Sequence, residues 1–155
     1  MAARSTNPTT AKPTDHFGLA GRTILGESTL PSAIQNLVIL RAGQLNGDTH
    51  AWSRTAAQTG ETRINLLTTW RDSKAFTEPE RAALDLTEQA TRIAKGGAAT
   101  ETWTDAAKHY TKNELSDLLM LIALINTTTG MNAITRRRRT EQPSTRQEGS
   151  AQGRS

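Results

Sequence analysis

The sequence predicts an all-α protein, and three kinds of signal indicate this fold class. Two capping boxes, Thr-x-x-Glu at residues 77–80 and 111–114, mark places where helices begin. Two breakers, Asn-Gly at 46–47 and Gly-Gly at 96–97, mark places where helices end. Between these signals apolar residues recur at helical spacing. The spacing of apolar residues and the helix start and stop signals therefore both predict helices throughout.

Length and composition predict a single domain without a membrane span. The chain has 155 residues, of which 35% are apolar and 22% charged, as in ordinary globular domains. Its longest apolar run, Leu118 to Ile125, is eight residues and is too short to cross a bilayer. The first residues lack the apolar block of a secretory signal, so a cytoplasmic location is the default expectation.

The predicted helical domain spans residues 17–139. Residues 1–16 are rich in Thr, Pro, Asn and Ser, and we predict a disordered N-terminal segment. The stretch 17–29 contains three glycines, which favours a loop or a broken helix that wraps the core. Residues 140–155 are predicted to form a disordered basic tail.

The first firm helix is predicted over Ser32 to Ala42, with Pro31 as its first residue. Its apolar spacing predicts a face on one side of the helix, made by Ile34, Leu37, Val38 and Arg41. After the break at 46–47, a second helix is expected from about Asp48, its N-cap, to about Gln58. The sequence thus predicts a helix-break-helix elbow.

Four further helical segments follow the elbow. They are expected at 61–71, at 78 to about 95, at 103–110 and from about 112 to 126 or a little beyond. The second of them presents a face of small side chains, made by Ala82, Ala83, Leu86 and Ala90. The last is apolar on nearly every side, which predicts burial in the middle of the fold or across a subunit contact. A final helical turn or two is expected within 131–139.

Three stretches resemble the carboxymuconolactone decarboxylase and alkylhydroperoxidase D-like superfamily. They are L-R-A-G-Q-L-N-G at 40–47, W-R-D-S-K-A-F-T-E-P-E-R-A-A-L at 70–84 and N-E-L-S-D-L-L-M-L-I-A-L-I-N at 113–126. The resemblance covers about residues 31–137. It implies a compact bundle of about six helices, assembled as a homo-oligomer (trimer or hexamer), with the elbow lining a pocket near a subunit boundary. It also implies that the helix from residue 78 takes part in close subunit packing.

The peroxidase branch of this superfamily has a Cys-x-x-Cys pair at the elbow, assisted by a His and by a Glu on the preceding helix. Aligned without a gap, the two thiol positions fall on Asp48 and Ala51, the trailing His on Thr55 and the Glu on Asn36. A second alignment deletes three residues, which places Trp52 at the trailing His and keeps Asp48 at the second thiol. Both alignments leave the site without sulfur, and these residues define the expected pocket.

The chain contains no cysteine at all. A thiolate is needed for nucleophilic attack on a peroxide, for sulfenic acid formation and for a disulfide relay. Dithiol peroxidase chemistry is therefore excluded within this chain, although the resemblance places it in a lineage of peroxiredoxin-type antioxidant proteins. Loss of both thiols together with the Glu favours a non-catalytic or assembly role.

A thiol-independent enzyme of the decarboxylase branch is the alternative, with Asp48 and His50 as an acid–base pair. Residues i and i+2 of a helix point about 200° apart, so both would face one substrate only at an irregular first turn. A metal would need a third ligand, and the sequence offers none beside these two. We therefore predict no metal and no cofactor. The simpler interpretation takes Asp48 as an N-cap and His50 as a remnant.

The basic charge of the chain belongs to its C-terminal end. Residues 136–155 hold six Arg against two Glu, a net charge of +4, whereas 17–135 carry a net charge of −1. The run Arg136 to Arg139 could bind polyanions weakly and without sequence preference, but no aromatic residue is interleaved to stack on bases. A solvated helix end is the favoured interpretation of this run.

Overall fold

The computed structural model describes residues 12–48, 53–92 and 100–141. These residues form seven α-helices and one 3₁₀ helix, with no strand among them. In chain order they are α1 (Pro13–Gly26), α2 (Ser32–Leu45), α3 (Ser53–Thr59), α4 (Glu61–Leu66), η1 (Leu67–Asp72), α5 (Glu78–Thr91), α6 (Thr100–Ala106) and α7 (Lys112–Glu141). The all-α prediction is confirmed, with one α-helix more than the six or so expected.

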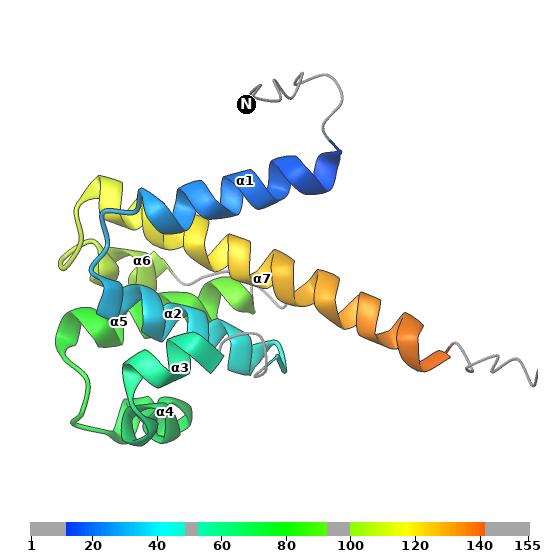
Figure 1. Cartoon of the computed structure of the whole chain (residues 1–155). Helices are drawn as coiled ribbons and strands as arrows, with labels where there is room; N and C mark the ends of the chain where they lie inside the picture. The colour runs from blue at the N-terminus through cyan, green and yellow to red at the C-terminus, as the bar shows by residue number, and fades with distance from the viewer. Residues whose placement is uncertain (1–11, 49–52, 93–99, 142–155) are drawn as a thin grey trace, which may run out of the picture.

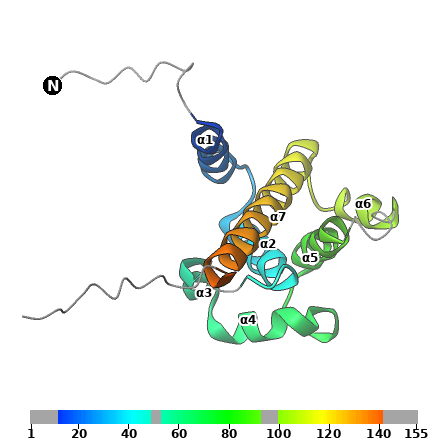
Figure 2. The same cartoon turned by 90° about the vertical axis from the view of Figure 1, so that its right-hand side faces the viewer.

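Helix α2 lies at the centre of the molecule, with α7 on one side, α5 beside it and α4 below in the view of Figure 2. Val38 and Ile39 pack in one apolar cluster with α5 and α7. Leu37 and Leu40 pack in a second cluster with Trp70 and other residues of the η1 region. The predicted one-sided face is therefore wrong, because partners surround α2 and bury nearly every side of it.

Helix α1 begins at Pro13, within the segment predicted to be disordered, and it continues to Gly26 where a loop or a broken helix is predicted. Proline suits a first helical position, and the Asp15 carboxylate accepts the N–H of Lys12 at 3.1 Å, which satisfies one free donor of the helix start. The helix packs on α7 (Figure 1). Gly21 faces Leu124 of α7, and a Cβ there would lie in contact with a methyl of Leu124 at 3.4 Å.

The segment that joins α1 to α2 is fastened to α7 by one carboxylate. The N–H and the hydroxyl of Thr29 both donate to Asp117 Oδ2, each at 2.7 Å. These two hydrogen bonds lower the pKa of Asp117. Because the two residues are 88 positions apart, this contact fixes the N-terminal part of the fold on its last helix.

The predicted helix over 61–71 is divided into α4 and η1. Thr69 has non-helical backbone angles, φ −119° and ψ 27°, which kink the segment. Leu67 and Trp70 of η1 are buried. The prediction of a single continuous helix here is wrong.

Helix α5 begins where its capping box predicts. The Glu80 carboxylate accepts the N–H of Thr77 at 2.9 Å, and the Thr77 hydroxyl accepts the N–H of Glu80. The helix ends at Thr91 with Arg92 as its C-cap, so it stops earlier than the predicted end near Lys95. The small-residue face of α5 belongs to the internal core against α2 and α7. Its alanines therefore allow close packing within the chain.

Helix α6 ends before the prediction, at Ala106, and Tyr110 follows outside it. The Tyr110 hydroxyl donates to the carbonyl of Pro79 at 2.5 Å, which ties the start of α7 to the start of α5. Burial and the nearby carboxylates of Glu80 and Glu114 raise the pKa of Tyr110.

Helix α7 continues without a break to Glu141, so the predicted interruption after Asn126 is wrong. The hydroxyls of Thr128 and Thr129 donate to the carbonyls four residues earlier, at 2.7 and 2.8 Å, so these residues satisfy their polar groups within the helix. The C-terminal part of α7 projects beyond the other helices (Figure 1). Across the described ranges, no helix combines the length and the apolar character that a membrane span requires.

Candidate functional site

The elbow after α2 is closed by backbone hydrogen bonds. Gly47 has a φ of +71°, and its N–H donates to the carbonyl of Gln44 at 3.1 Å. The N–H of Asp48 donates to the carbonyl of Gly43 at 2.9 Å. Together these are the two bonds of a Schellman motif, which needs a left-handed residue at the position that Gly47 fills. The predicted break at 46–47 is confirmed.

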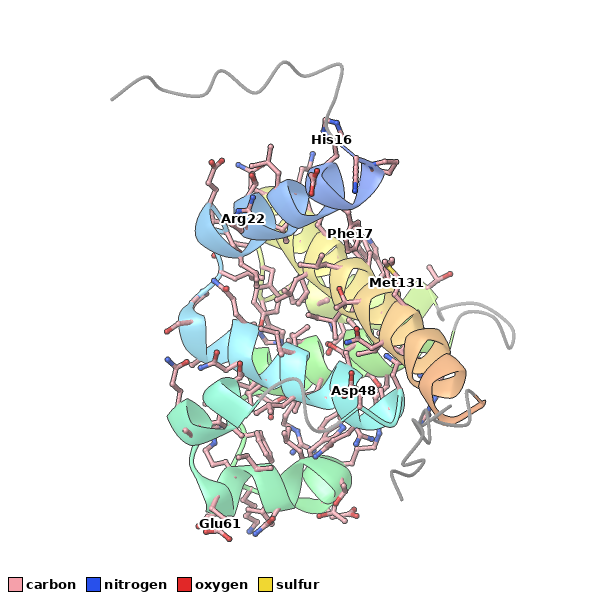
Figure 3. The ribbon with its side chains drawn as sticks, turned by 45° about the vertical axis from the view of Figure 1, so that its right-hand side comes forward. His16, Phe17, Arg22, Asp48, Glu61 and Met131 are labelled. Atoms are coloured by element: carbon pink, nitrogen blue, oxygen red, sulfur yellow. The ribbon has the colours of Figure 1, made fainter. Side chains whose placement is uncertain are left out.

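Asp48 is buried directly after this turn, with 2% of its surface exposed. The amide nitrogen of Asn132 lies 3.4 Å from its Oδ2, so α7 supplies a donor to the carboxylate. Figure 3 places Asp48 at the end of α2, next to α7. The described part of α3 begins at Ser53, and the predicted site residues His50, Ala51 and Trp52 lie outside the described residues.

Amide and hydroxyl side chains form hydrogen bonds beside the elbow. The Asn46 side chain donates to the carbonyl of Ala42 and to Asn126 Oδ1, both at 2.8 Å. The Thr91 hydroxyl donates to the same oxygen of Asn126 at 3.2 Å. One polar network thus joins the C-terminal ends of α2 and α5 to the middle of α7.

The structure does not bring Asn36 to the elbow. Twelve residues separate Asn36 from Asp48 along α2 and its cap, which corresponds to about 18 Å of helix rise. The Asn36 amide instead lies 3.5 Å from Gln58 Oε1 on α3. Thr55 is half-buried on α3, where its carbonyl accepts the hydroxyl of Thr59. Of the four predicted pocket residues, the structure describes only Asn36 on α2 and Thr55 on α3, and the pocket stays a prediction.

The most concentrated cluster of charged groups lies elsewhere, around Glu88 on α5. Oε1 of Glu88 accepts N–H groups from Arg41 Nε (2.9 Å), Arg41 Nη2 (2.6 Å) and Trp70 Nε1 (2.8 Å). Oε2 accepts from Arg71 Nη2 at 3.0 Å. Arg71 also pairs with Asp85 and stacks on the Trp70 ring, 4.3 Å from its centroid. Glu88 and these three donors, the Glu88 cluster, join α2, η1 and α5.

The Glu88 cluster is mostly buried, and its electrostatics favour a charged carboxylate. Glu88 is 4% exposed and Arg41 is 8% exposed. Burial raises the pKa of Glu88, but the hydrogen bonds from Trp70, Arg41 and Arg71 outweigh burial and leave that pKa below its ordinary value. The Glu88 carboxylate accepts four N–H groups, which come from three residues, and it therefore has little capacity left to exchange a proton with a substrate. We therefore assign the cluster a structural role.

An open hollow of about 290 Å³ lies next to the Glu88 cluster. Its lining consists of charged and hydroxyl side chains with one aromatic ring: Arg41, Thr68, Thr69, Trp70, Arg71, Asp72, Glu88 and Arg92. Nη1 of Arg92, which directly follows α5, lies 4.0 Å from Oε2 of Glu88. The arginines are thus engaged by carboxylates of the chain itself.

The sequence does not predict the Glu88 cluster. The apolar spacing of the predicted helix over 32–42 includes Arg41 in an apolar face, although an arginine within an apolar helix indicates a buried carboxylate partner. The stretches that resemble the superfamily contain Arg41, Trp70 and Arg71, so the resemblance could have pointed to these three residues. The partner Glu88 lies 47 residues from Arg41, so no local pattern could identify it.

Neither a thiol nor a metal centre is found in the described ranges. The chain has no cysteine. Within residues 12–48, 53–92 and 100–141, no three His, Asp or Glu side chains come together in a way that could hold a metal ion. The groups at the elbow that the structure describes are amides, hydroxyls and one buried carboxylate.

Comparisons with known proteins complete the description. No family model matches the chain. An uncharacterized protein of Bacillus subtilis (strain 168), YdfG, is 30% identical over 107 residues, which cover 64% of this chain and 71% of YdfG. A crystal structure of an Agrobacterium tumefaciens protein of unknown function, provisionally described as antioxidant defence protein AhpD, matches with a TM-score of 0.75 and 24% identity. That match covers 83% of this chain and 90% of the other, and it establishes the fold.

Proposed function

We propose that this chain is a non-catalytic member of the carboxymuconolactone decarboxylase and alkylhydroperoxidase D-like superfamily and that it acts as an assembly protein. The three stretches that resemble the superfamily and the shared fold support this proposal. The observation that carries this proposal is the absence of cysteine from all 155 residues. Without sulfur, the fold cannot form the thiolate, the sulfenic acid or the disulfide that the dithiol reaction requires.

The described part of the elbow supports the same proposal. Asp48 stands where a thiol would stand in the peroxidase branch, and its carboxylate is buried against Asn132. The hydrogen bonds of Asn46, Asn126 and Thr91 join three helices at this place. Polar groups that bond to one another in this way stabilise helix packing and leave fewer donors and acceptors for a substrate.

The assembly that we propose is a homo-oligomer, a trimer or a hexamer, in the cytoplasm. The superfamily resemblance supports the oligomer. The run Arg136 to Arg139 lies on the projecting end of α7, and we propose that it contributes at most weak, salt-sensitive binding to polyanions. Removing residues 136–155 and comparing duplex DNA binding at low and physiological salt tests this contribution.

Purified protein is expected to show no peroxide consumption with a dithiol reductant, because no residue can carry the reaction. The measurement is hydrogen peroxide and organic hydroperoxide loss with excess dithiothreitol. A heat-treated sample of the same protein sets the background, and a cysteine-containing thiol peroxidase in the same mixture shows that the assay works. Robust turnover above the heat-treated sample would sink the proposal.

The buried Asp48 carboxylate also favours a second candidate function, a thiol-independent enzyme in which Asp48 and His50 form an acid–base pair. A carboxylate beside an imidazole raises the pKa of the imidazole. If the pair exists, Asp48→Asn should lower the pKa of His50 by about one unit, as ¹H–¹⁵N NMR titration of the histidine ring would show. His109, exposed after α6, is the internal control. An unchanged His50 titration in a folded variant would exclude the pair.

A further inference from the structure

The elbow contains the only asparagine of the chain that is followed by glycine. Asn46 is the C-cap residue of α2, and Gly47 is the residue with positive φ that follows it. Both residues are exposed, so water has access to the bond between them. Glycine has no Cβ, which leaves its backbone nitrogen free to approach the side chain before it. The pair therefore has the composition of a site that can modify itself covalently.

The reaction open to such a pair is deamidation through a cyclic imide. The Gly47 nitrogen attacks Cγ of Asn46, so that a new N–Cγ bond forms and the Cγ–Nδ2 bond breaks. Nδ2 leaves as ammonia together with the proton of the Gly47 N–H. Water then opens the imide at one of its two C–N bonds, which leaves aspartate or isoaspartate at position 46. The step needs no enzyme, because both reacting groups belong to neighbouring residues.

The closed elbow holds the backbone in a geometry that opposes this attack. Asn46 has a φ of −90° and a ψ of 0°. At this ψ the nitrogen of Gly47 eclipses that of Asn46, and the ring can close only after rotation about the Asn46 Cα–C bond. The N–H of Gly47 also donates to the carbonyl of Gln44 at 3.1 Å, a bond that the attack must break. The Schellman turn thus keeps the nucleophile out of position.

Hydrogen bonds hold the other reacting group as well. Nδ2 of Asn46 donates to the carbonyl of Ala42 and to Oδ1 of Asn126, both at 2.8 Å. An amide nitrogen has two hydrogens to donate, so both are in use. The Thr91 hydroxyl donates to the same Oδ1 at 3.2 Å and fixes the Asn126 side chain. The Asn46 amide therefore cannot turn towards Gly47 while α7 remains in place beside it.

We propose that Asn46 is a latent deamidation site and that its hydrogen bond to Asn126 holds it unreacted in the folded protein. The reaction requires the elbow to open locally, because the bonds of Gly47 and of the Asn46 side chain must break first. Any change that separates α7 from the end of α2 then exposes the site. This inference is independent of the proposed assembly role.

The products cannot restore the closed elbow. Aspartate at position 46 has no hydrogen to donate, whereas the Ala42 carbonyl and Asn126 Oδ1 are both acceptors. Isoaspartate adds a methylene group to the backbone within the turn, which the spacing of the Schellman bonds does not accommodate. Deamidation therefore converts a transient opening of the elbow into a permanent one.

The test follows the loss of Asn46 in full-length protein by peptide mapping and mass spectrometry, during incubation at mildly alkaline pH. Folded wild type should react slowly, and wild type unfolded in urea should react fastest. Asn126→Ala should raise the rate in the folded protein about two- to tenfold, the factor that corresponds to one lost hydrogen bond. Asn113→Ala, at an exposed position near the start of the same helix, is the matched control and should leave the rate unchanged. Circular dichroism confirms that both variants are folded.

Amide hydrogen exchange provides a measurement that needs no variant. The Gly47 N–H must break its bond to Gln44 before it exchanges with solvent, and the same opening precedes deamidation. Urea below the unfolding transition should therefore raise both rates by the same factor in the wild type. A rise in Gly47 exchange with no change in deamidation would overturn the link between opening and reaction.

The other outcomes are equally decisive. Folded wild type that loses Asn46 as fast as the unfolded chain would show that the elbow gives no protection. A folded Asn126→Ala protein that reacts at the wild-type rate would overturn the role of Asn126. Asn46 that stays intact in urea would overturn the site itself.

Discussion

Replacing Glu88 with alanine is expected to lower the free energy of unfolding by about 3–5 kcal/mol, because it leaves the buried Arg41 guanidinium without its carboxylate. Glu88 also accepts N–H groups from Trp70 and Arg71, so one substitution removes the hydrogen-bond acceptor that α2, η1 and α5 share. Urea denaturation followed by circular dichroism measures the change. Glu27→Ala, at an exposed position after α1, is the control and should change the free energy by less than about 0.5 kcal/mol.

The same carboxylate predicts how stability depends on pH. The pKa of Glu88 in the folded protein is below its ordinary value of 4.5, so its ionised form stabilises the fold at neutral pH. This contribution is present above pH 4.5 and is lost as the pH falls through the lowered folded pKa. Glu88→Gln cannot titrate, so the stability difference between wild type and this variant should shrink below pH 4.5. A difference that stays constant down to pH 3 would contradict the assignment.

Leu118→Ala is expected to cost about 2–5 kcal/mol of unfolding free energy, whereas the neighbouring Leu119→Ala should cost far less within one subunit. Leu118 is fully buried in the core, and Leu119 is 37% exposed. Both substitutions remove the same atoms from the same helix, so intrinsic helix propensity cancels between them. Thermal and urea unfolding at several protein concentrations measure the two effects.

The comparison of the two leucines also tests the register of α7. The loss from Leu118→Ala should be similar at every protein concentration, because it arises within one chain. Equal losses that do not change with dilution would show that the register of α7 is different from the one described.

Local signals in the sequence predicted the ends of several helices well. The capping box of Thr77 and Glu80 starts α5 where expected, because both of its hydrogen bonds join residues three positions apart. The break at Gly47 likewise depends on neighbouring backbone groups. The three glycines of 17–29 predict a loop or a broken helix, but all three lie within the helix α1, which packs on α7. That contact joins residues too distant in sequence for a local pattern to indicate.

Burial was harder to predict than helix ends. Both α2 and α7 are strongly apolar. The spacing of their apolar residues predicts one apolar face on α2 and apolar residues on nearly every side of α7. In the single chain α2 is covered on nearly every side, whereas Leu119 and Met120 of α7 are exposed, because tertiary partners decide which apolar sides are covered. The candidate site shows the same limit: the elbow was located from Gly47, but Glu88 and Arg41 meet only through the fold.

The central position of α2 also has a consequence for synthesis. Its covering partners come later in the chain, since Arg41 bonds to Glu88 and Asn46 bonds to Asn126, 47 and 80 residues further on. At about 5–20 residues per second, the ribosome needs roughly 4–16 s to add those 80 residues. Until Glu88 and Asn126 have been made, α2 lacks these two partners. The Schellman bonds at its end are local, so the nascent chain can complete this turn before the rest of the bundle exists.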